Sequence, residues 1–161
     1  VASGDAASAV YVYKQRFVVG VTSMRCEFDM RARAATVSTA VFAILTLSDP
    51  QNQIFQASFR TVSGDFAFFE TGSVDAGIRQ HFASVGGAAP SNWTHLAVDV
   101  TVGPSASLKV EVNGAPLAIN SPNDLSVFTS IDRQVLSLGL VTKVDETDWT
   151  AEFDNVICWA R

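Results

Sequence analysis

The sequence predicts an all-β protein built as a two-sheet antiparallel β-sandwich. Three observations support this fold class. Runs of alternating apolar and polar residues recur along the 161 residues, turn-forming residues separate them, and no segment has the pattern of a long helix. The clearest runs lie in the segment 92–118, where Gly103-Pro104-Ser105 joins two alternating strands and Asn113-Gly114 supplies a two-residue hairpin turn.

The runs before residue 92 predict the first strands. In the third run the even-numbered residues from Met24 to Met30 are apolar and face the core, whereas Arg25, Glu27, Asp29 and Arg31 face outward. The run 40–47 is apolar on both faces, which is typical of a central strand. The segment 78–84 fits both a strand and a helical stripe. The expected strands are 8–14, 17–21, 24–31, 40–47, 54–60 and 65–71.

The second half of the chain continues the same pattern. In the strand that opens at Trp93, His95 and Asp99 point to the same face as the Trp side chain, and Leu96 and Val98 point to the other. Loops are expected at 119–130 and at the acidic segment 145–149. The expected strands are 93–100, 108–112, 135–141 and 151–159.

Composition limits the classes of partner. We expect one domain over residues 1–161, because this length can bury about 70% of the unfolded surface in a single core. The net charge of −5 and the lack of any Lys/Arg cluster make nucleic acid and anionic membranes poor partners. No apolar run is long enough to span a bilayer. The small, polar first residues lack a secretory signal and are typical of a trimmed mature domain.

Four motifs resemble the concanavalin A-like (laminin-G-like) lectin and glucanase superfamily, over about residues 17–159. They are the Trp93 strand, the Val112-Asn113-Gly114 hairpin, the segment 136–139 and the closing segment 153–156. The resemblance implies a jelly-roll sandwich and favours a strand at 78–84. It also implies that the first and last strands adjoin, which would let Cys26 and Cys158 form a disulfide; two buried thiols are the alternative.

The same resemblance implies a structural calcium ligand at Asp154, since this position often binds calcium in such sandwiches together with backbone carbonyls. The acidic loop 145–149 is a separate oxygen-rich candidate, and a plain solvated loop is its alternative. No cofactor other than this calcium is expected.

No complete catalytic set is found. Glycoside hydrolysis needs two carboxyl groups across the scissile bond. Glu27-Phe28-Asp29 and Glu152-Phe153-Asp154 begin the laminarinase-like pattern, but Ala32 and Ile157 stand where its third acid belongs. The Arg25-Cys26-Glu27 and Gln53-Ile54-Phe55 segments resemble alginate lyases, but Phe55 replaces the histidine needed for proton transfer. His95 is interpreted as a strand histidine with an ordinary partner.

A ligand-binding face is predicted on the polar side of several strands, where planar multi-donor side chains suit sugar hydroxyls or uronate carboxylates. Scattered exposed polar residues are the alternative. The predicted residues are Arg31, Gln56, Ser58, Arg60, Arg79 and His81.

The expected function is a carbohydrate-binding, lectin-like module of a secreted or cell-envelope protein, without catalysis. A structural sandwich that binds a cell-surface protein is the second hypothesis, and a polysaccharide-degrading glycosidase or lyase is the third. The sequence does not indicate an oligomeric state.

Overall fold

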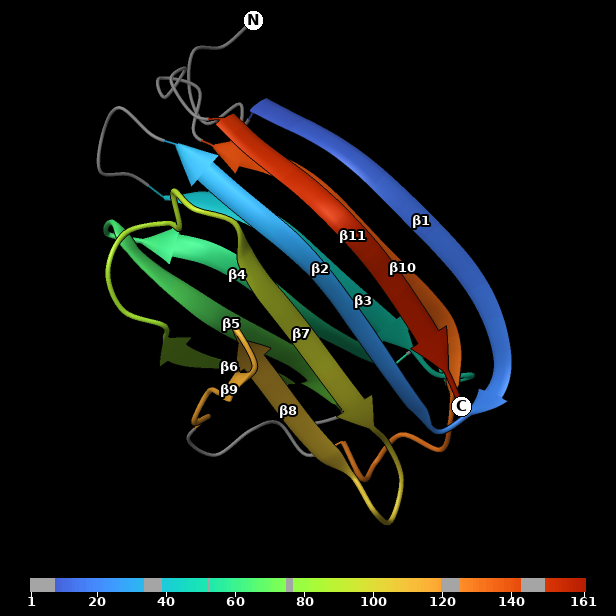
Figure 1. Ribbon diagram of the computed structural model, residues 1–161. Helices are drawn as coiled ribbons and strands as arrows, with labels where there is room; N and C mark the ends of the chain where they lie inside the picture. Colours follow the sequence, from blue (N-terminus) through green and yellow to red (C-terminus); the bar gives the residue numbers. More distant parts are fainter. Residues whose placement is uncertain (1–7, 34–38, 52, 75–76, 120–124, 143–149) are drawn as a thin grey trace, which may run out of the picture.

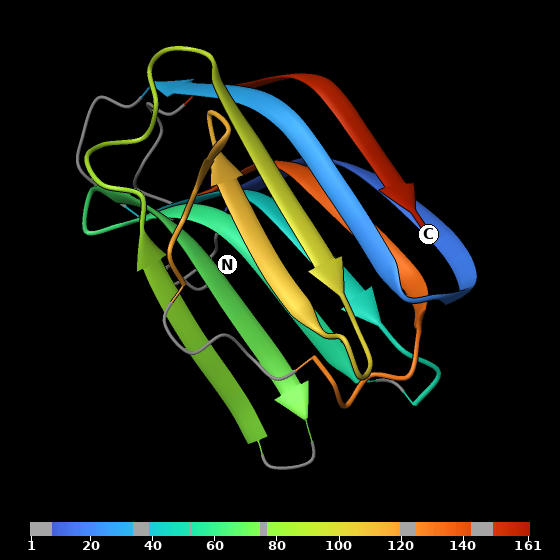
Figure 2. The same ribbon diagram turned by 60° about the horizontal axis from the view of Figure 1, so that its bottom comes forward.

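The computed structural model describes residues 8–33, 39–51, 53–74, 77–119, 125–142 and 150–161, with backbone alone at 8–19, 73–74, 77–81 and 142. The described residues form eleven strands in two antiparallel sheets, which confirms the predicted all-β sandwich. Figures 1 and 2 show the sheets packed face to face as two layers. The six-stranded sheet has the order β1 (Ser8–Val21), β10 (Ile131–Thr142), β3 (Ala40–Ser48), β4 (Ile54–Val62), β5 (Asp65–Val74) and β6 (Gly77–Ser84).

The second sheet has five strands. Their order is β11 (Thr150–Ala160), β2 (Ser23–Arg33), β7 (Thr94–Thr101), β8 (Ser107–Val112) and β9 (Ala115–Pro116). The segment predicted as either strand or helix is strand β6. The runs 8–14 and 17–21 belong to one strand, β1, whose pairing with β10 shifts between Phe17 and Val21. The described part of the chain contains no helix of the length and apolarity that a membrane crossing needs.

Phenylalanine rings fill the space between the sheets. Phe28 of β2 and Phe59 of β4 meet edge to face across the sandwich, with ring centroids 6.0 Å apart. Phe59 also contacts Phe66 and Phe68 of β5. All four are fully buried, and each contributes roughly 1.5–3 kcal/mol by leaving water. The alternation predicted for β2 is confirmed, since its even-numbered residues are buried and its odd-numbered ones are not.

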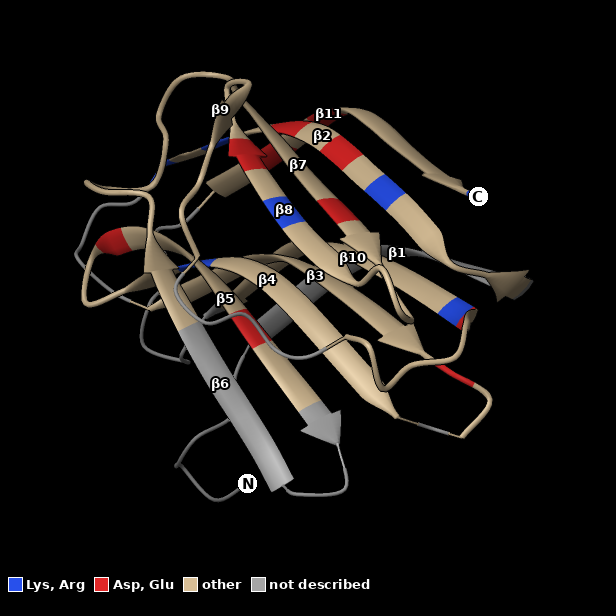
Figure 3. Ribbon diagram, turned by 90° about the horizontal axis from the view of Figure 1, so that it is seen from below, with Lys and Arg blue, Asp and Glu red and all other residues tan. Residues whose placement is uncertain are grey.

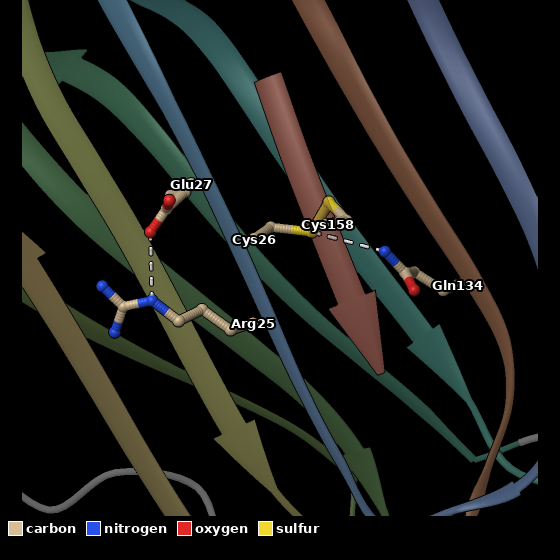
Figure 4. The surroundings of a disulfide bond; sticks show 5 residues. All are labelled: Arg25, Cys26, Glu27, Gln134 and Cys158. Carbon is tan, nitrogen blue, oxygen red and sulfur yellow. Dashed lines mark hydrogen bonds and ion pairs between the residues drawn. A yellow bond between two sulfur atoms is a disulfide. The ribbon is translucent and has the colours of Figure 1, made fainter. Parts of the chain in front are cut away.

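A disulfide joins Cys26 of β2 to Cys158 of β11, as predicted. The two cysteines are directly paired in the register of these strands, on the core-facing side of the sheet. Gln134 of β10 reaches across from the other sheet and donates a hydrogen bond from Nε2 to Cys26 Sγ (Figure 4). The expectation that the first and last strands adjoin is wrong. The first strand, β1, lies beside β10, and the last strand, β11, adjoins the second strand, β2.

Turn residues fix the hairpins of the five-stranded sheet. Asn113 and Gly114 have positive φ values of 51° and 77°, as the predicted two-residue turn requires. Asn113 also accepts a hydrogen bond from the backbone N–H of His95 through its side-chain Oδ1, and it donates its own N–H to the His95 carbonyl. The turn after β8 therefore holds the start of β7, and with it His95, in place.

Candidate functional site

Charged side chains gather on the outer side of the five-stranded sheet. Directly paired residues in an antiparallel sheet share a face, so the outward residues of β2 align with those of β11, β7 and β8. Figure 3 shows charged residues gathered along β2, β7 and β8, whereas β3 and β4 are mostly uncharged. We call this surface the charged face, which comprises Arg25, Glu27, Asp29, Arg31, Arg33, His95, Asp99, Lys109, Glu111, Glu152 and Asp154.

Asp29 is the centre of one hydrogen-bonded group. Its Oδ1 lies 2.8 Å from His95 Nδ1, and its Oδ2 accepts a hydrogen bond of 2.6 Å from the Asn155 side chain. The donated hydrogen bonds from Asn155 and then His95 lower the pKa of Asp29. Because a carboxylate only accepts, His95 Nδ1 donates in this contact, and Nε2 lies 3.9 Å from Glu27 Oε2. The contact with Asp29 fixes the orientation of the imidazole ring.

Asn155 reaches Asp29 because the β11 strand bulges at this point. The pairing of β11 with β2 shifts between Asp154 and Ile157, and Asn155 has a φ of 52°. Asn tolerates the left-handed region better than most residues, since its short amide can hydrogen-bond locally. The bulge therefore re-aims the Asn155 amide onto the charged face.

Arg25 ties three carboxylates together. It donates from Nη2 to Glu111 at 2.8 Å and from Nε to Glu27 at 3.2 Å, and Nη1 lies 3.9 Å from Asp99. The Arg25 hydrogen bond lowers the pKa of Glu111, and the pKa of Arg25 is raised chiefly by the same bond. Such partly exposed ion pairs contribute little to folding stability. Their effect is to hold the guanidinium and carboxylates in one arrangement.

An aromatic ring borders each end of the charged face. At one end the Arg31 guanidinium lies 4.7 Å above the Trp93 ring and donates to Glu152 at 2.6 Å. Trp93 is 45% exposed. At the other end Trp159 of β11 pairs with Arg25. Six residues separate Arg25 from Arg31 along β2, so the two aromatic ends lie on the order of 20 Å apart.

A cleft lies at the Trp159 end. Its volume is about 280 Å³, and we call it the terminal cleft. It occupies the space where β2 begins, between β11 and β7. Its lining residues are Ser23, Met24, Arg25, Asp99, Trp159 and Arg161.

The predicted ligand-binding residues do not share one face. Arg31 is on the charged face, whereas Gln56 and Arg60 are on β4 in the other sheet. The grouping of these three on one surface is therefore wrong, because outward-facing polarity does not reveal to which sheet a strand belongs. Ser58 lies between Gln56 and Arg60, and it accepts a hydrogen bond from Arg60.

The register also separates Arg79 and His81 from Gln56. Gln56 pairs with Thr71, which pairs in turn with Gln80. Arg79 and His81 occupy the alternate register positions, paired with Gly72 and Glu70, and their role in ligand binding stays a prediction. Their side chains lie outside what the structure describes.

Arg60 is occupied by local contacts. Its guanidinium lies 3.7 Å above the Phe69 ring and donates to Ser58, and burial lowers its pKa. These contacts hold the guanidinium flat against the six-stranded sheet.

The predicted calcium ligand Asp154 is exposed and accepts a hydrogen bond from the Asn155 backbone N–H. The described residues include no group of three or more His, Cys, Asp or Glu side chains that could hold a metal ion. Both oxygens of its cross-strand neighbour Asp29 are already hydrogen-bonded. Asp154 and Asp29 alone therefore do not make a cation site. Calcium binding at Asp154 stays a prediction, and a lower melting temperature in the presence of chelator would support it. The acidic loop 145–149 lies outside the described residues.

Sequence reasoning missed the association of His95, Asn155 and Trp159 with the outward residues of β2. The alternation placed His95 and Asp99 on one face, but not beside Asp29 and Arg25. The sequence did contain a signal for the bulge at Asn155. Asn tolerates a positive φ better than most residues, and an Asn inside the predicted strand 151–159 is therefore a candidate for a bulge.

Comparison with known proteins extends the description of the fold. No protein-family model and no curated protein matches the chain. Among solved structures, an endo-β-1,4-glucuronan lyase from the fungus Trichoderma reesei is similar with a TM-score of 0.64 and 10% identity, covering 98% of this chain and 76% of that one. An alginate lyase from Pseudomonas aeruginosa gives 0.57 at 13% identity, over 88% and 66% of the two chains.

A carbohydrate-binding module from Bacillus subtilis is also similar, with a TM-score of 0.53 and 15% identity over 94% of this chain and 83% of that one. Identities this low establish the fold alone. The chain therefore shares its two-sheet β-sandwich fold with two polysaccharide lyases and a carbohydrate-binding module.

Proposed function

We propose that the protein is a concanavalin A-like carbohydrate-binding module of a secreted or cell-envelope protein, and that glycans bind on the charged face. The observation that carries this proposal is the row of carboxylate, guanidinium and imidazole groups along β2 and β7, bordered by Trp93 and Trp159. Arginine and carboxylate groups form strong hydrogen bonds with hydroxyl groups, and an indole ring packs against the apolar side of a sugar ring.

The side chains of the charged face hold one another in place before any ligand arrives. Arg25 is fixed by Glu27 and Glu111, and His95 is fixed by Asp29. Binding to such a surface immobilises few additional rotamers, which lowers the entropic cost of association. The Cys26–Cys158 disulfide supports an oxidising compartment, in agreement with an exported protein.

A glycan array with neutral and uronic polysaccharides, followed by calorimetry on the glycans that bind, tests the proposal. We expect Trp93→Ala and His95→Ala each to weaken binding about tenfold. Gln56→Ala is the matched control, because Gln56 is an exposed polar residue of the opposite sheet; its affinity should stay within about twofold. Loss of binding in Gln56→Ala with wild-type affinity in Trp93→Ala and His95→Ala would move the site to the six-stranded sheet. Absence of binding to every glycan would favour the protein-interaction hypothesis.

Glycan cleavage is a second candidate, which the Asp29–His95 contact specifically favours. An imidazole oriented by a carboxylate is suited to act as a general base, and Glu27 is the nearest additional acid. The binding proposal expects no release of reducing sugar or unsaturated uronate from any polysaccharide that binds. Turnover that disappears in His95→Ala, with binding retained, would replace the module by an enzyme.

A further inference from the structure

We propose that the terminal cleft binds the single sugar residue at the end of a glycan chain. This inference rests on the proposed function and names the part of the charged face that recognises the ligand's end. The cleft has an aromatic wall at Trp159, an acceptor at Asp99 and cationic groups at Arg25 and Arg161.

The size of the cleft restricts its occupant. Its volume of about 280 Å³ lies at the lower end of small-molecule pockets, which begin at roughly 300 Å³. One sugar ring fits a space of this size. The remaining residues of a longer glycan would then lie along the charged face toward Trp93.

The chemistry of the lining suits a sugar ring. Asp99 is the most weakly held of the carboxylates around Arg25, since its nearest contact with the guanidinium is 3.9 Å against 2.8 Å for Glu111. The Asp99 side chain is also 36% exposed, so its oxygens have capacity to accept hydrogen bonds from adjacent hydroxyl groups. Trp159 supplies the ring surface against which the apolar side of a pyranose packs.

Backbone hydrogen bonds hold the Arg161 side of the cleft in place. The Arg161 carbonyl accepts the N–H groups of Thr22 and Ser23 at 3.0 and 3.1 Å, and the Arg161 N–H donates to the Ser23 carbonyl at 2.8 Å. Arg161 is thereby fixed beside the first residue of β2. In this arrangement the rest of the glycan runs from the cleft along the charged face toward Trp93, so the sugar residue in the cleft is the terminal one.

Calorimetry with methyl glycosides of glucose, galactose and mannose, with sodium glucuronate, and with defined oligosaccharides of the glycan found on the array tests this inference. At least one monosaccharide probe should compete with the oligosaccharide. Trp159→Ala and Asp99→Asn should each weaken both ligands about tenfold or more. Gln56→Ala is again the control, because Gln56 is an exposed residue of the opposite sheet and does not line the cleft; it should bind within about twofold of wild type.

Stoichiometry provides a second measurement that does not depend on folding of the variants. Terminal recognition predicts one protein molecule bound per glycan chain, whatever the chain length. Several protein molecules per chain would overturn the inference. So would wild-type affinity in both Asp99→Asn and the conservative Trp159→Leu. In either case weaker binding by Trp93→Ala would leave the proposed function standing, whereas absence of all glycan binding would refute both.

Discussion

Breaking the Cys26–Cys158 disulfide should lower the melting temperature by roughly 5–15 °C without changing the fold. The bond spans 132 residues of sequence. On the loop-closure relation a cross-link of this span removes about 5 kcal/mol of unfolded-chain entropy, although measured stabilisations are typically about 2–4 kcal/mol. For a domain of this size each kcal/mol shifts the melting temperature by roughly 2–4 °C, which gives the expected range.

The assay compares the same protein in two redox states. Wild-type protein is unfolded, refolded with and without reductant, and melted under both conditions by circular dichroism. Cys26 is 1% exposed, so the unfolding step is needed for the reductant to reach the bond. The double variant Cys26→Ala/Cys158→Ala is the control, because its melting temperature should not respond to reductant.

Two results would refute this reasoning. One is a midpoint that reductant leaves unchanged within about 2 °C, which would mean that the β2–β11 pairing is equally constrained without the bond. The other is the detection of two reactive thiols per chain in denatured, unreduced protein, which would mean that the bond is absent. Because Cys26 also accepts a hydrogen bond from Gln134, the double variant should melt slightly below reduced wild type.

Three further predictions concern the charged face. Asp29 has a lowered pKa in the folded protein, so its stabilising contribution is complete above about pH 4 and is lost as the pH falls through the folded pKa. The difference in unfolding free energy between wild type and Asp29→Asn should therefore shrink on acidification. Denaturant titrations that give a constant difference would contradict this prediction. The unfolding free energy of Asn155→Gly should exceed that of Asn155→Ala by about 1–2 kcal/mol, because only glycine adopts the positive φ freely. Equal stabilities of the two variants would show that the bulge relaxes. Arg31→Ala should weaken glycan binding through the loss of its contacts with Trp93 and Glu152 while shifting the melting temperature by less than about 2 °C, and unfolding would instead mark Arg31 as structural.

Much of the fold could be predicted from the sequence because side-chain alternation is local. The period of two along β2 separates its buried residues from its exposed ones without knowledge of any neighbouring strand. The apolar run that predicted a central strand is β3, which lies between β10 and β4. The turn at Asn113-Gly114 was equally readable, since the required φ values are a property of those two residues.

The grouping of residues into a site was less predictable because it depends on strand pairing across long sequence distances. Alternation showed that Arg31 and Gln56 both face away from the core, but it carries no information on which sheet each strand joins. The contact between Asp29 and His95 joins residues 66 positions apart, and that between Asp29 and Asn155 joins residues 126 positions apart. Each residue could be recognised singly, and only the register brings the three together.

The disulfide links these two levels of prediction. Cys26 and Cys158 are direct partners in the register of β2 and β11, so antiparallel geometry places Arg25 beside Trp159 and alternation turns both side chains outward. The aromatic wall of the terminal cleft therefore follows from the pairing of β11 with β2. Asp99, in contrast, joins the cleft only through the pairing of β2 with β7, for which the sequence offers no covalent marker. Where a cysteine pair joins direct register partners, as Cys26 and Cys158 do, it also marks which outward residues lie side by side next to it.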